Sequence, residues 1–286
     1  MASDRETVAI VGGGTMGVGL LYVFAAAGYD MTLVEPDAAR GDAARERLRK
    51  AAEGGLARGK LTKAQAQAVT EGYRHVTTAG DLAEGLSLVI ETVPERLDIK
   101  DAVLADIAAR TPKIIATNTS ALSIDRLAQA VRDPETFVGM HFFNPVWSLP
   151  LVEIIRGAAT SDATLCAAHG FAEAIGKSAI TVTDTPGFAT SRLDLIAAME
   201  AIRMVEEGVA SAEDIDRAMM VAYRHPIGPL RLSDIVGLDV RLDIARSLSG
   251  SLGPRYAPPR MLEEMVERGE LGQKTGRGFF DWTETA

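Results

Sequence analysis

The sequence has a single cysteine among its 286 residues, so no disulfide can form within the chain. This cysteine, Cys166, stands among alanines in a stretch typical of a helix. A small thiol in such surroundings is more often packed than reactive, and we expect it to be inert and partly buried. We predict no metal site.

Basic residues are also outnumbered, with 30 Lys and Arg against 39 Asp and Glu and a formal net charge of -9. This balance gives no general attraction to nucleic acid or to an anionic membrane. No uncharged apolar run reaches the ~18 residues that span a bilayer, and residues 1–7 lack the apolar core of a signal peptide. We therefore expect a cytoplasmic protein without nucleic-acid or membrane partners.

Short apolar runs alternate with helical stretches over the first two-thirds of the chain, which is typical of a doubly wound α/β domain. The expected strands cover residues 8–11, 31–34, 86–92, 114–117, 137–141, 151–155 and 179–182. The expected helices cover residues 16–27, 38–53, a stretch that begins near 61, 97–109, 124–131 and 162–175.

The strand pattern stops near Asp184, where the dipeptide Pro186-Gly187 marks a turn. Beyond it only helices are expected, over residues 190–207, 212–222, 238–248 and 259–268. A chain of this length accommodates two domains. We predict an α/β domain over residues 1–184 and an all-helical domain over residues 185–286.

A glycine-rich string, GGGTMG, follows the first expected strand and fits the spacing G-x-G-x-x-G. Gly12 permits a tight turn, Gly14 lets the backbone approach a pyrophosphate, and Gly17 lets the next helix pack closely. That helix begins with Thr15 and Met16, whose N–H groups lie at the positive end of its dipole. The string therefore predicts a Rossmann-type dinucleotide-binding domain.

Glu35 closes the second expected strand, 23 residues after Gly12. A carboxylate there can accept both ribose hydroxyls of an adenosine and would repel a 2′-phosphate, so NAD is favoured over NADP. Arg40 lies close enough in sequence to leave NADP open as an alternative.

His141 ends an expected strand, where open α/β sheets place ligand-binding groups. Twelve residues later, Glu153 interrupts the apolar string LVEII, and a buried carboxylate needs a partner such as an imidazole. A neutral histidine can remove a hydroxyl proton during hydride transfer, while a carboxylate on its other nitrogen fixes the tautomer. Alternatively, His141 is structural and Glu153 faces water on an edge strand.

Together these motifs resemble the L-3-hydroxyacyl-CoA dehydrogenase family, including its bacterial 3-hydroxybutyryl-CoA dehydrogenases. The resemblance covers nearly the whole chain. It is carried by the glycine loop and by ETVPE (91–95) with Lys100, NTS (118–120), HFFNP (141–145), LVEII (151–155), DTPGF (184–188), PIGPL (226–230) and LGQKTGRGFF (271–280). It implies NAD-dependent oxidation of the 3-hydroxyl of a short acyl-CoA thioester, or the reverse reduction, and a homodimer formed through the C-terminal domain.

The resemblance also implies roles for residues on the substrate side. By similarity, His141 is the catalytic base and Glu153 its orienting partner. Ser120 would hydrogen-bond the hydroxyl or carbonyl oxygen of the substrate. Asn144 would contact the nicotinamide side of the cofactor and help to polarise that oxygen.

On the cofactor side, Glu95 and Lys100 look like contacts of NAD, and Lys274 would reach over from the C-terminal tail. Each of the two lysines has a second interpretation. Lys100 could be a solvated helix residue, and Lys274 could belong to a mobile tail.

Three departures from the family bear on the substrate. Ser191 stands where the family usually has an asparagine that faces the substrate, and its hydroxyl has a shorter reach. Trp147 could shorten the acyl chain that fits, or equally pack on the surface. The first long helix is less lysine-rich than in relatives that bind CoA phosphates, although Arg47 and its neighbours Arg45, Arg49 and Lys50 could do so or form a solvated face.

Other functions compete with an acyl-CoA dehydrogenase. The same chemistry could act on a hydroxyacyl group held by an acyl carrier protein, or on a free hydroxy acid. A different class is a non-catalytic dinucleotide-binding protein, like the crystallin relatives of the family. The presence of His141, Glu153 and Ser120 speaks against that class.

Overall fold

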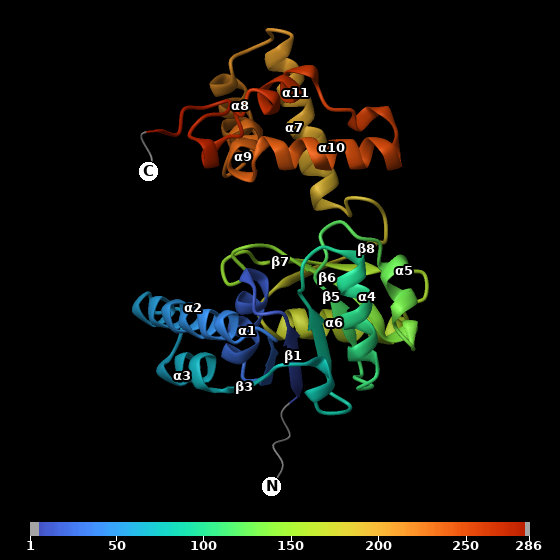
Figure 1. Cartoon of the computed structure of the whole chain (residues 1–286). Coiled ribbons are helices and arrows are strands. Elements are labelled where there is room, and N and C mark those ends of the chain that lie inside the picture. The colour runs from blue at the N-terminus through green and yellow to red at the C-terminus, as the bar shows by residue number, and fades with distance from the viewer. Residues whose placement is uncertain (1–5, 284–286) are drawn as a thin grey trace. The chain divides into compact units, whose positions relative to one another are not determined.

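The computed structural model describes residues 6–283 and divides the chain after Thr185 into two compact units (Figure 1). Among these residues, no helix is both long enough and apolar enough to cross a membrane. Cys166 is exposed, so the expected partial burial is wrong. It lies on the solvent face of the helix α6 (Asp162–Ala174), which packs on the sheet through other residues, among them Leu165 and Ala168.

The first unit is built on an eight-stranded sheet with the strand order β3-β2-β1-β4-β5-β6-β7-β8. Neighbouring strands are parallel except for β6 and β7, which are antiparallel. The strands are β1 (Thr7–Val11), β2 (Asp30–Val34), β3 (Tyr73–Val76), β4 (Leu88–Glu91), β5 (Ile115–Thr117), β6 (Phe137–Phe142), β7 (Leu151–Arg156) and β8 (Ser178–Thr183).

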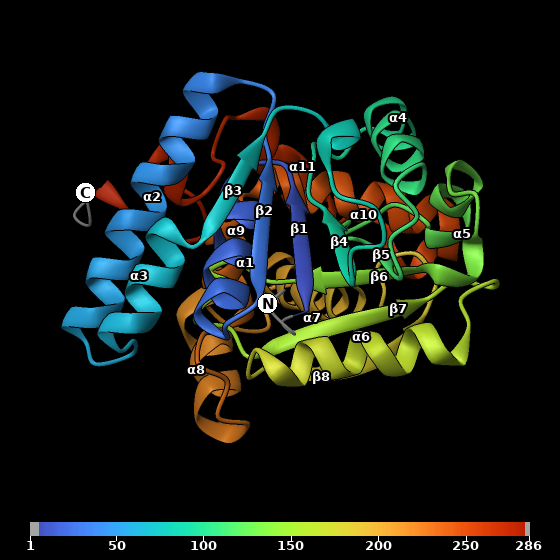
Figure 2. The ribbon, with the colours of Figure 1, turned by 90° about the horizontal axis from the view of Figure 1, so that it is seen from below.

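Helices cover both faces of this sheet, as expected for a doubly wound domain. They are α1 (Thr15–Ala26), α2 (Ala38–Ala57), α3 (Lys63–Glu71), α4 (Leu97–Ala108), α5 (Ile124–Leu127) and α6 (Asp162–Ala174). Figure 2 shows α1, α2 and α3 beside the β1–β3 side of the sheet and α6 along β7 and β8. Side chains alternate between the two faces of a strand, and Val8 and Ile10 therefore join the core formed with α1 and α6.

The predicted Rossmann-type fold is confirmed, and each predicted strand of this unit is present. One strand was not predicted, β3, because its sequence YRHV is mostly polar and only Val76 is fully buried. The helix expected near residue 61 begins at Lys63, after a capping box in which Thr62 and Gln65 exchange hydrogen bonds.

The second unit contains five α-helices among the described residues and is all-helical as predicted. They are α7 (Thr190–Glu206), α8 (Ala212–Ala222), α9 (Pro229–Val236), α10 (Leu238–Leu252) and α11 (Arg260–Glu267). Its core gathers Met199, Ile202, Leu230 and Leu242, which are almost completely buried. The helix α9, eight residues long with Pro229 at its first position, was not predicted.

Candidate active site

The glycine loop lies between β1 and α1, at the carboxyl edge of the sheet. Gly12 has a φ of +110°, a backbone conformation that favours glycine. A Cβ atom on Gly17 would lie 1.8 Å from the carbonyl oxygen of Gly12, so only glycine lets α1 pack this closely. Around Gly14, by contrast, a Cβ atom would meet no heavy atom within 4 Å.

The amino end of α1, at Thr15 and Met16, is suited to an anion. Its N-cap, Gly14, has no side chain that could cap the helix, and the first turn carries no acidic residue. The free N–H groups and the helix dipole therefore face the open space beside Gly14. This arrangement fits the pyrophosphate of a dinucleotide.

Two glycine variants should separate cofactor binding from folding. We expect Gly17→Ala to lower the free energy of unfolding by about 3 kcal/mol or more, because the methyl group collides with backbone. We expect Gly14→Ala to leave the melting temperature nearly unchanged but to raise the Kd of NADH at least about tenfold, because its methyl group enters the pyrophosphate space. Thermal unfolding and NADH titration measure both effects, and wild-type affinity in Gly14→Ala would place the pyrophosphate elsewhere.

Glu35 follows β2 and borders a cavity of about 550 Å³ that extends from the glycine loop. Its carboxylate accepts the N–H groups of Gly13, at 2.9 Å, and Asp37, at 3.1 Å. The guanidinium of Arg40 lies 3.1 Å away. The rest of the cavity wall is largely apolar, with Val34, Pro36, Val93, Pro94 and Ile99. The cavity thus joins an apolar wall to a carboxylate at one end, which fits an adenosine.

His141 and Glu153 are brought together by the antiparallel pairing of β6 and β7, in which they lie directly opposite each other. Their side chains therefore project from the same face of the sheet. The Nδ1 atom of His141 lies 2.8 Å from Oε2 of Glu153. The proposal that Glu153 faces water from an edge strand is wrong, because β7 is paired on both sides and the side chain is completely buried.

The segment after β6 is held on both sides of Asn144. Before it, the N–H of Phe142 donates to Oδ1 of Asn118 at 2.9 Å. After the cis peptide bond between Asn144 and Pro145, Lys177 donates to the carbonyl oxygens of Val146 and Leu149. Burial lowers the pKa of this lysine. These contacts fix the backbone around Asn144.

Trp147 packs on the surface rather than in the core. Its ring lies 5.5 Å from that of Tyr22 in α1, measured between centroids, and about two-fifths of the residue is exposed. Trp147 therefore packs against Tyr22 on α1.

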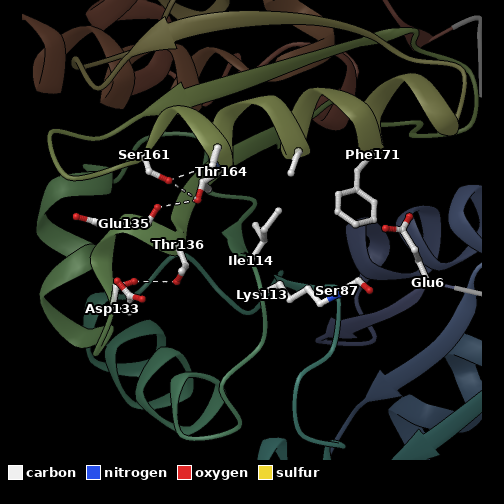
Figure 3. A pocket seen from close by; sticks show the side chains of 12 residues that line it. Glu6, Ser87, Lys113, Ile114, Asp133, Glu135, Thr136, Ser161, Thr164 and Phe171 are labelled. Carbon is white, nitrogen blue, oxygen red and sulfur yellow. Dashed lines mark hydrogen bonds between the residues drawn. The ribbon is translucent and has the colours of Figure 1, made fainter.

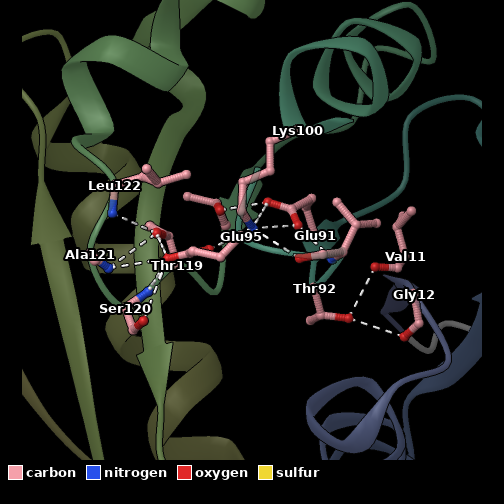
Figure 4. Close-up of polar contacts among 12 residues, drawn as sticks. Val11, Gly12, Glu91, Thr92, Glu95, Lys100, Thr119, Ser120, Ala121 and Leu122 are labelled. Atoms are coloured by element: carbon pink, nitrogen blue, oxygen red, sulfur yellow. Dashed lines mark hydrogen bonds and ion pairs between the residues drawn. The ribbon is translucent and has the colours of Figure 1, made fainter. Parts of the chain in front are cut away.

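A second group of polar side chains follows β4 and β5 (Figure 4). One carboxylate oxygen of Glu95 accepts hydrogen bonds from the Thr119 hydroxyl at 2.5 Å and from the N–H groups of Ser120 and Ala121 at 3.0 and 3.2 Å. Ser120 is thereby held at the carboxyl end of β5. Lys100 is not a solvated residue, since its side chain is 1% exposed and lies between Glu91 and Glu95.

The remaining predicted residues are carried by other elements of the two units. Arg47, on α2, donates to the carbonyl oxygen of Gly13 at 2.9 Å and so lies beside the glycine loop. In the C-terminal unit, Ser191 lies in the first turn of α7. Lys274 forms an ion pair of 2.5 Å with Asp239, which lowers the pKa of that aspartate.

Another cavity, of about 340 Å³, lies at the opposite edge of the sheet (Figure 3). Its lining includes Glu6, Ser87, Lys113 and Thr136, which come just before the strands rather than after them. None of the predicted site residues lines it. Within residues 6–283, no group of three or more His, Cys, Asp or Glu side chains is placed to hold a metal ion.

Parallel strands place their carboxyl ends at one edge, so the glycine loop, Glu35, Glu95, Ser120 and His141 all belong to the same side of the sheet. The chain turns to opposite sides after β1 and β4, and open α/β sheets bind dinucleotides at such a switch point. Fold and site together define a two-domain nicotinamide-dependent dehydrogenase.

The chain belongs to the 3-hydroxyacyl-CoA dehydrogenase family. Residues 7–185 match the NAD binding domain of 3-hydroxyacyl-CoA dehydrogenase, and residues 187–282 match its C-terminal domain. NAD is therefore the cofactor, and the protein is an NAD-dependent oxidoreductase.

Relatives in bacteria and animals match along nearly the whole chain. A 3-hydroxybutyryl-CoA dehydrogenase of Mycobacterium tuberculosis is 38% identical over 99% of this chain and 100% of its own length. The mitochondrial hydroxyacyl-coenzyme A dehydrogenase of Homo sapiens is 36% identical over 96% of this chain and 90% of its own. The crystal structure of (S)-3-hydroxybutyryl-CoA dehydrogenase from Ralstonia eutropha has a TM-score of 0.93 and 37% identity, covering 98% of this chain and 100% of that one.

Proposed function

We propose that the protein oxidises the 3-hydroxyl group of a short 3-hydroxyacyl-CoA such as 3-hydroxybutyryl-CoA, or catalyses the reverse reduction, with His141 as the base. The hydrogen bond between His141 and Glu153, at the sheet edge that carries the glycine loop, is the observation that carries this proposal. The substrate class follows the names of the relatives, which match along nearly the full chain.

The two ring nitrogens of His141 have different proposed roles. Nδ1 keeps its proton and donates a hydrogen bond to Glu153. This leaves Nε2 as the acceptor for the proton of the substrate hydroxyl. The buried carboxylate then stabilises the imidazolium that forms. NAD, held by the glycine loop and Glu35, would supply the acceptor for the carbinol hydride, and a substrate that gives up this hydride and its hydroxyl proton would become the 3-oxoacyl thioester.

Four other residues are proposed to orient the substrate. Ser120 would hydrogen-bond the reacting oxygen, and Asn144 would polarise it from the nicotinamide side. Ser191 would face the acyl chain from the C-terminal domain. Arg47 would contact the CoA phosphates, for which its place beside the glycine loop gives support.

On the cofactor, Glu35 is proposed to bind the adenosine ribose. Glu95, Lys100 and Lys274 are proposed to act on its nicotinamide side. The proposed units of function are an NAD-binding domain over residues 1–184 and a substrate and dimerisation domain over residues 185–286.

The preference for NAD should depend on Glu35. In Glu35→Ala, the guanidinium of Arg40 loses its partner and can contact a 2′-phosphate instead. We expect the ratio of kcat/KM for NADPH to that for NADH to rise by about a hundredfold. The carboxylate that repels the 2′-phosphate is removed, and the guanidinium of Arg40 becomes free to attract it. Steady-state kinetics with both cofactors measures the ratio, and Glu35→Ala/Arg40→Ala should lose most of the gain. An unchanged ratio in the single variant would remove Glu35 from the ribose site.

We also propose a cytoplasmic homodimer that forms through the C-terminal domain. Val221 at the end of α8 and Tyr223 just after it are each more than 70% exposed, and Met220 on the same helix is also exposed. Exposed apolar groups of this kind often mark an interface between subunits. Light scattering of the pure protein should give twice the chain mass of 30.4 kDa, and a monomer at micromolar concentration would contradict the dimer.

Turnover of acetoacetyl-CoA, measured by NADH absorbance, tests the main proposal. A parallel assay uses acetoacetyl groups on an acyl carrier protein and free acetoacetate. Oxidation of NADH with the CoA thioester supports the proposal. Activity only with the carrier-protein substrate or only with free acetoacetate would show that the substrate is not a CoA thioester. NADH binding without turnover of any of them would indicate a non-catalytic binding protein.

A further inference from the structure

Glu91 and Lys100 form a buried ion pair at the carboxyl end of β4. Both carboxylate oxygens of Glu91 lie close to Nζ of Lys100, at 2.8 and 2.9 Å, and the two side chains are 0% and 1% exposed. Glu91 also accepts the Thr117 hydroxyl and the Val93 N–H, each at 2.6 Å. The pair is thus fixed by hydrogen bonds from β5 and from the segment that follows β4.

Glu95 shares the same ammonium group, with its Oε2 atom 3.3 Å from Nζ of Lys100 (Figure 4). Burial raises the pKa of Glu95, but the hydrogen bond from Thr119 and the charge of Lys100 outweigh it and hold the pKa below its usual value. Two carboxylates therefore share one cation. We call Glu91, Lys100 and Glu95 the acidic cluster, and its formal charge is -1.

The neighbouring charges do not compensate this excess, because they pair with each other. Arg96 contacts Asp98 at 2.5 Å, and Arg126 contacts Asp101 at 2.8 Å. Both pairs are partly or largely exposed to solvent, which screens them further. The buried part of the acidic cluster is screened much less.

The acidic cluster lies on the nicotinamide side of the proposed cofactor site. The adenosine cavity is lined by Glu35 after β2 and by the segment after β4, whereas Glu95 is bound to Thr119 and Ser120 after β5, the next strand away from β2. A dinucleotide that crosses the switch point with its pyrophosphate at Gly14 extends its second nucleotide over β4 and β5. Its nicotinamide ring therefore comes to the side of the sheet that carries Glu91 and Glu95.

We propose that the acidic cluster favours the oxidised over the reduced cofactor, and that Glu91 sets this preference without touching the cofactor. The inference rests on the proposed binding mode of NAD. The nicotinamide ring is positively charged only in its oxidised form, so a nearby net negative charge attracts NAD+ more than NADH. Repulsion of the pyrophosphate is the same for both forms and cancels in the ratio of their dissociation constants.

Glu91→Gln tests the proposal by binding rather than by turnover. The amide oxygen can still accept from Thr117 or Val93, but the negative charge is gone. We expect the ratio of Kd for NAD+ to Kd for NADH, measured by calorimetric titration, to rise about fivefold over the wild type. Because the charge is buried, the difference between the two proteins should persist at about 0.5 M salt.

Three further variants separate charge from structure. Glu91→Gln/Lys100→Gln removes one charge of each sign, so the ratio should return close to the wild-type value even where both affinities fall. Asp101→Asn removes a charge from the same helix, but a screened and paired one, and should leave the ratio within about twofold. If Glu91→Gln does not fold, Glu95→Gln carries the same charge change on a side chain that is 37% exposed, and should raise the ratio likewise.

The outcomes are distinct. Equal weakening of NAD+ and NADH binding in Glu91→Gln, or no change in either, would overturn the proposed preference and leave Glu91 a structural residue. A wild-type protein that binds neither form would instead overturn the proposed function on which the inference rests.

Discussion

Replacement of His141 by alanine is expected to lower kcat by about a thousandfold or more, while the Kd of NADH stays within about twofold of the wild type. The imidazole is the proposed proton acceptor, and the proposed cofactor contacts other than Asn144 come from other elements of the chain. The change can be measured by steady-state turnover of acetoacetyl-CoA and by NADH titration of the same preparation. The resulting cavity beside Glu153 also leaves a buried carboxylate without its imidazole, so some loss of stability is expected.

His169→Ala provides a matched control for this variant. His169 is partly exposed on α6, and its Nε2 atom lies 2.8 Å from the hydroxyl oxygen of Thr181. It should retain wild-type kcat. Parallel loss of kcat and NADH affinity in His141→Ala would show that this histidine supports the fold of the site instead of accepting the proton.

Glu153→Gln is expected to lower kcat by about a hundredfold with little loss of stability. The amide can keep a hydrogen bond to Nδ1, so His141 stays in place, but the charge that stabilises the imidazolium is lost. A charged carboxylate loses hydration energy when it is buried. A neutral glutamine of the same size avoids this cost, which offsets much of the stabilisation lost with the charged hydrogen bond. Thermal unfolding and kcat should therefore change independently.

Asp216→Asn is the corresponding control in the second unit. Asp216 is also a buried carboxylate, and it accepts the N–H groups of Leu230 and Arg231, each at 2.9 Å, at the start of α9. This variant should lose stability while kcat stays nearly unchanged. A Glu153→Gln protein that unfolds early but turns over normally when folded would contradict the proposed role of the dyad.

Much of the sheet could be predicted because its strands are marked locally. Residues 8–11 are a continuous apolar run before the glycine loop, and residues 31–34 are apolar except for Thr32 and precede a carboxylate; they form β1 and β2 as expected. β3 lacks such a mark, since three of its four side chains are not fully buried and its identity as a strand depends on pairing with β2. Short edge strands are set by their neighbours more than by their own composition.

The site could be predicted only in part, since several of its features depend on tertiary packing. The sequence indicates a histidine at a strand end and a glutamate inside an apolar run. Their contact, however, depends on the antiparallel register of β6 and β7. Likewise, Lys100 has the sequence surroundings of an ordinary helix residue. It becomes buried because α4 packs against β4, where Glu91 binds its ammonium group and also accepts a hydrogen bond from Thr117.

The antiparallel pair of β6 and β7 has a consequence for how the substrate range of this enzyme can change. The eight residues 143–150 join the two dyad members, yet the ladder between the strands sets the distance from His141 to Glu153. The distance between His141 and Glu153 should therefore tolerate changes in the part of this connection that follows Asn144 and Pro145. Grafting other segments between Pro145 and Leu151 tests whether this region changes the substrate range while His141, Asn144 and Glu153 are kept.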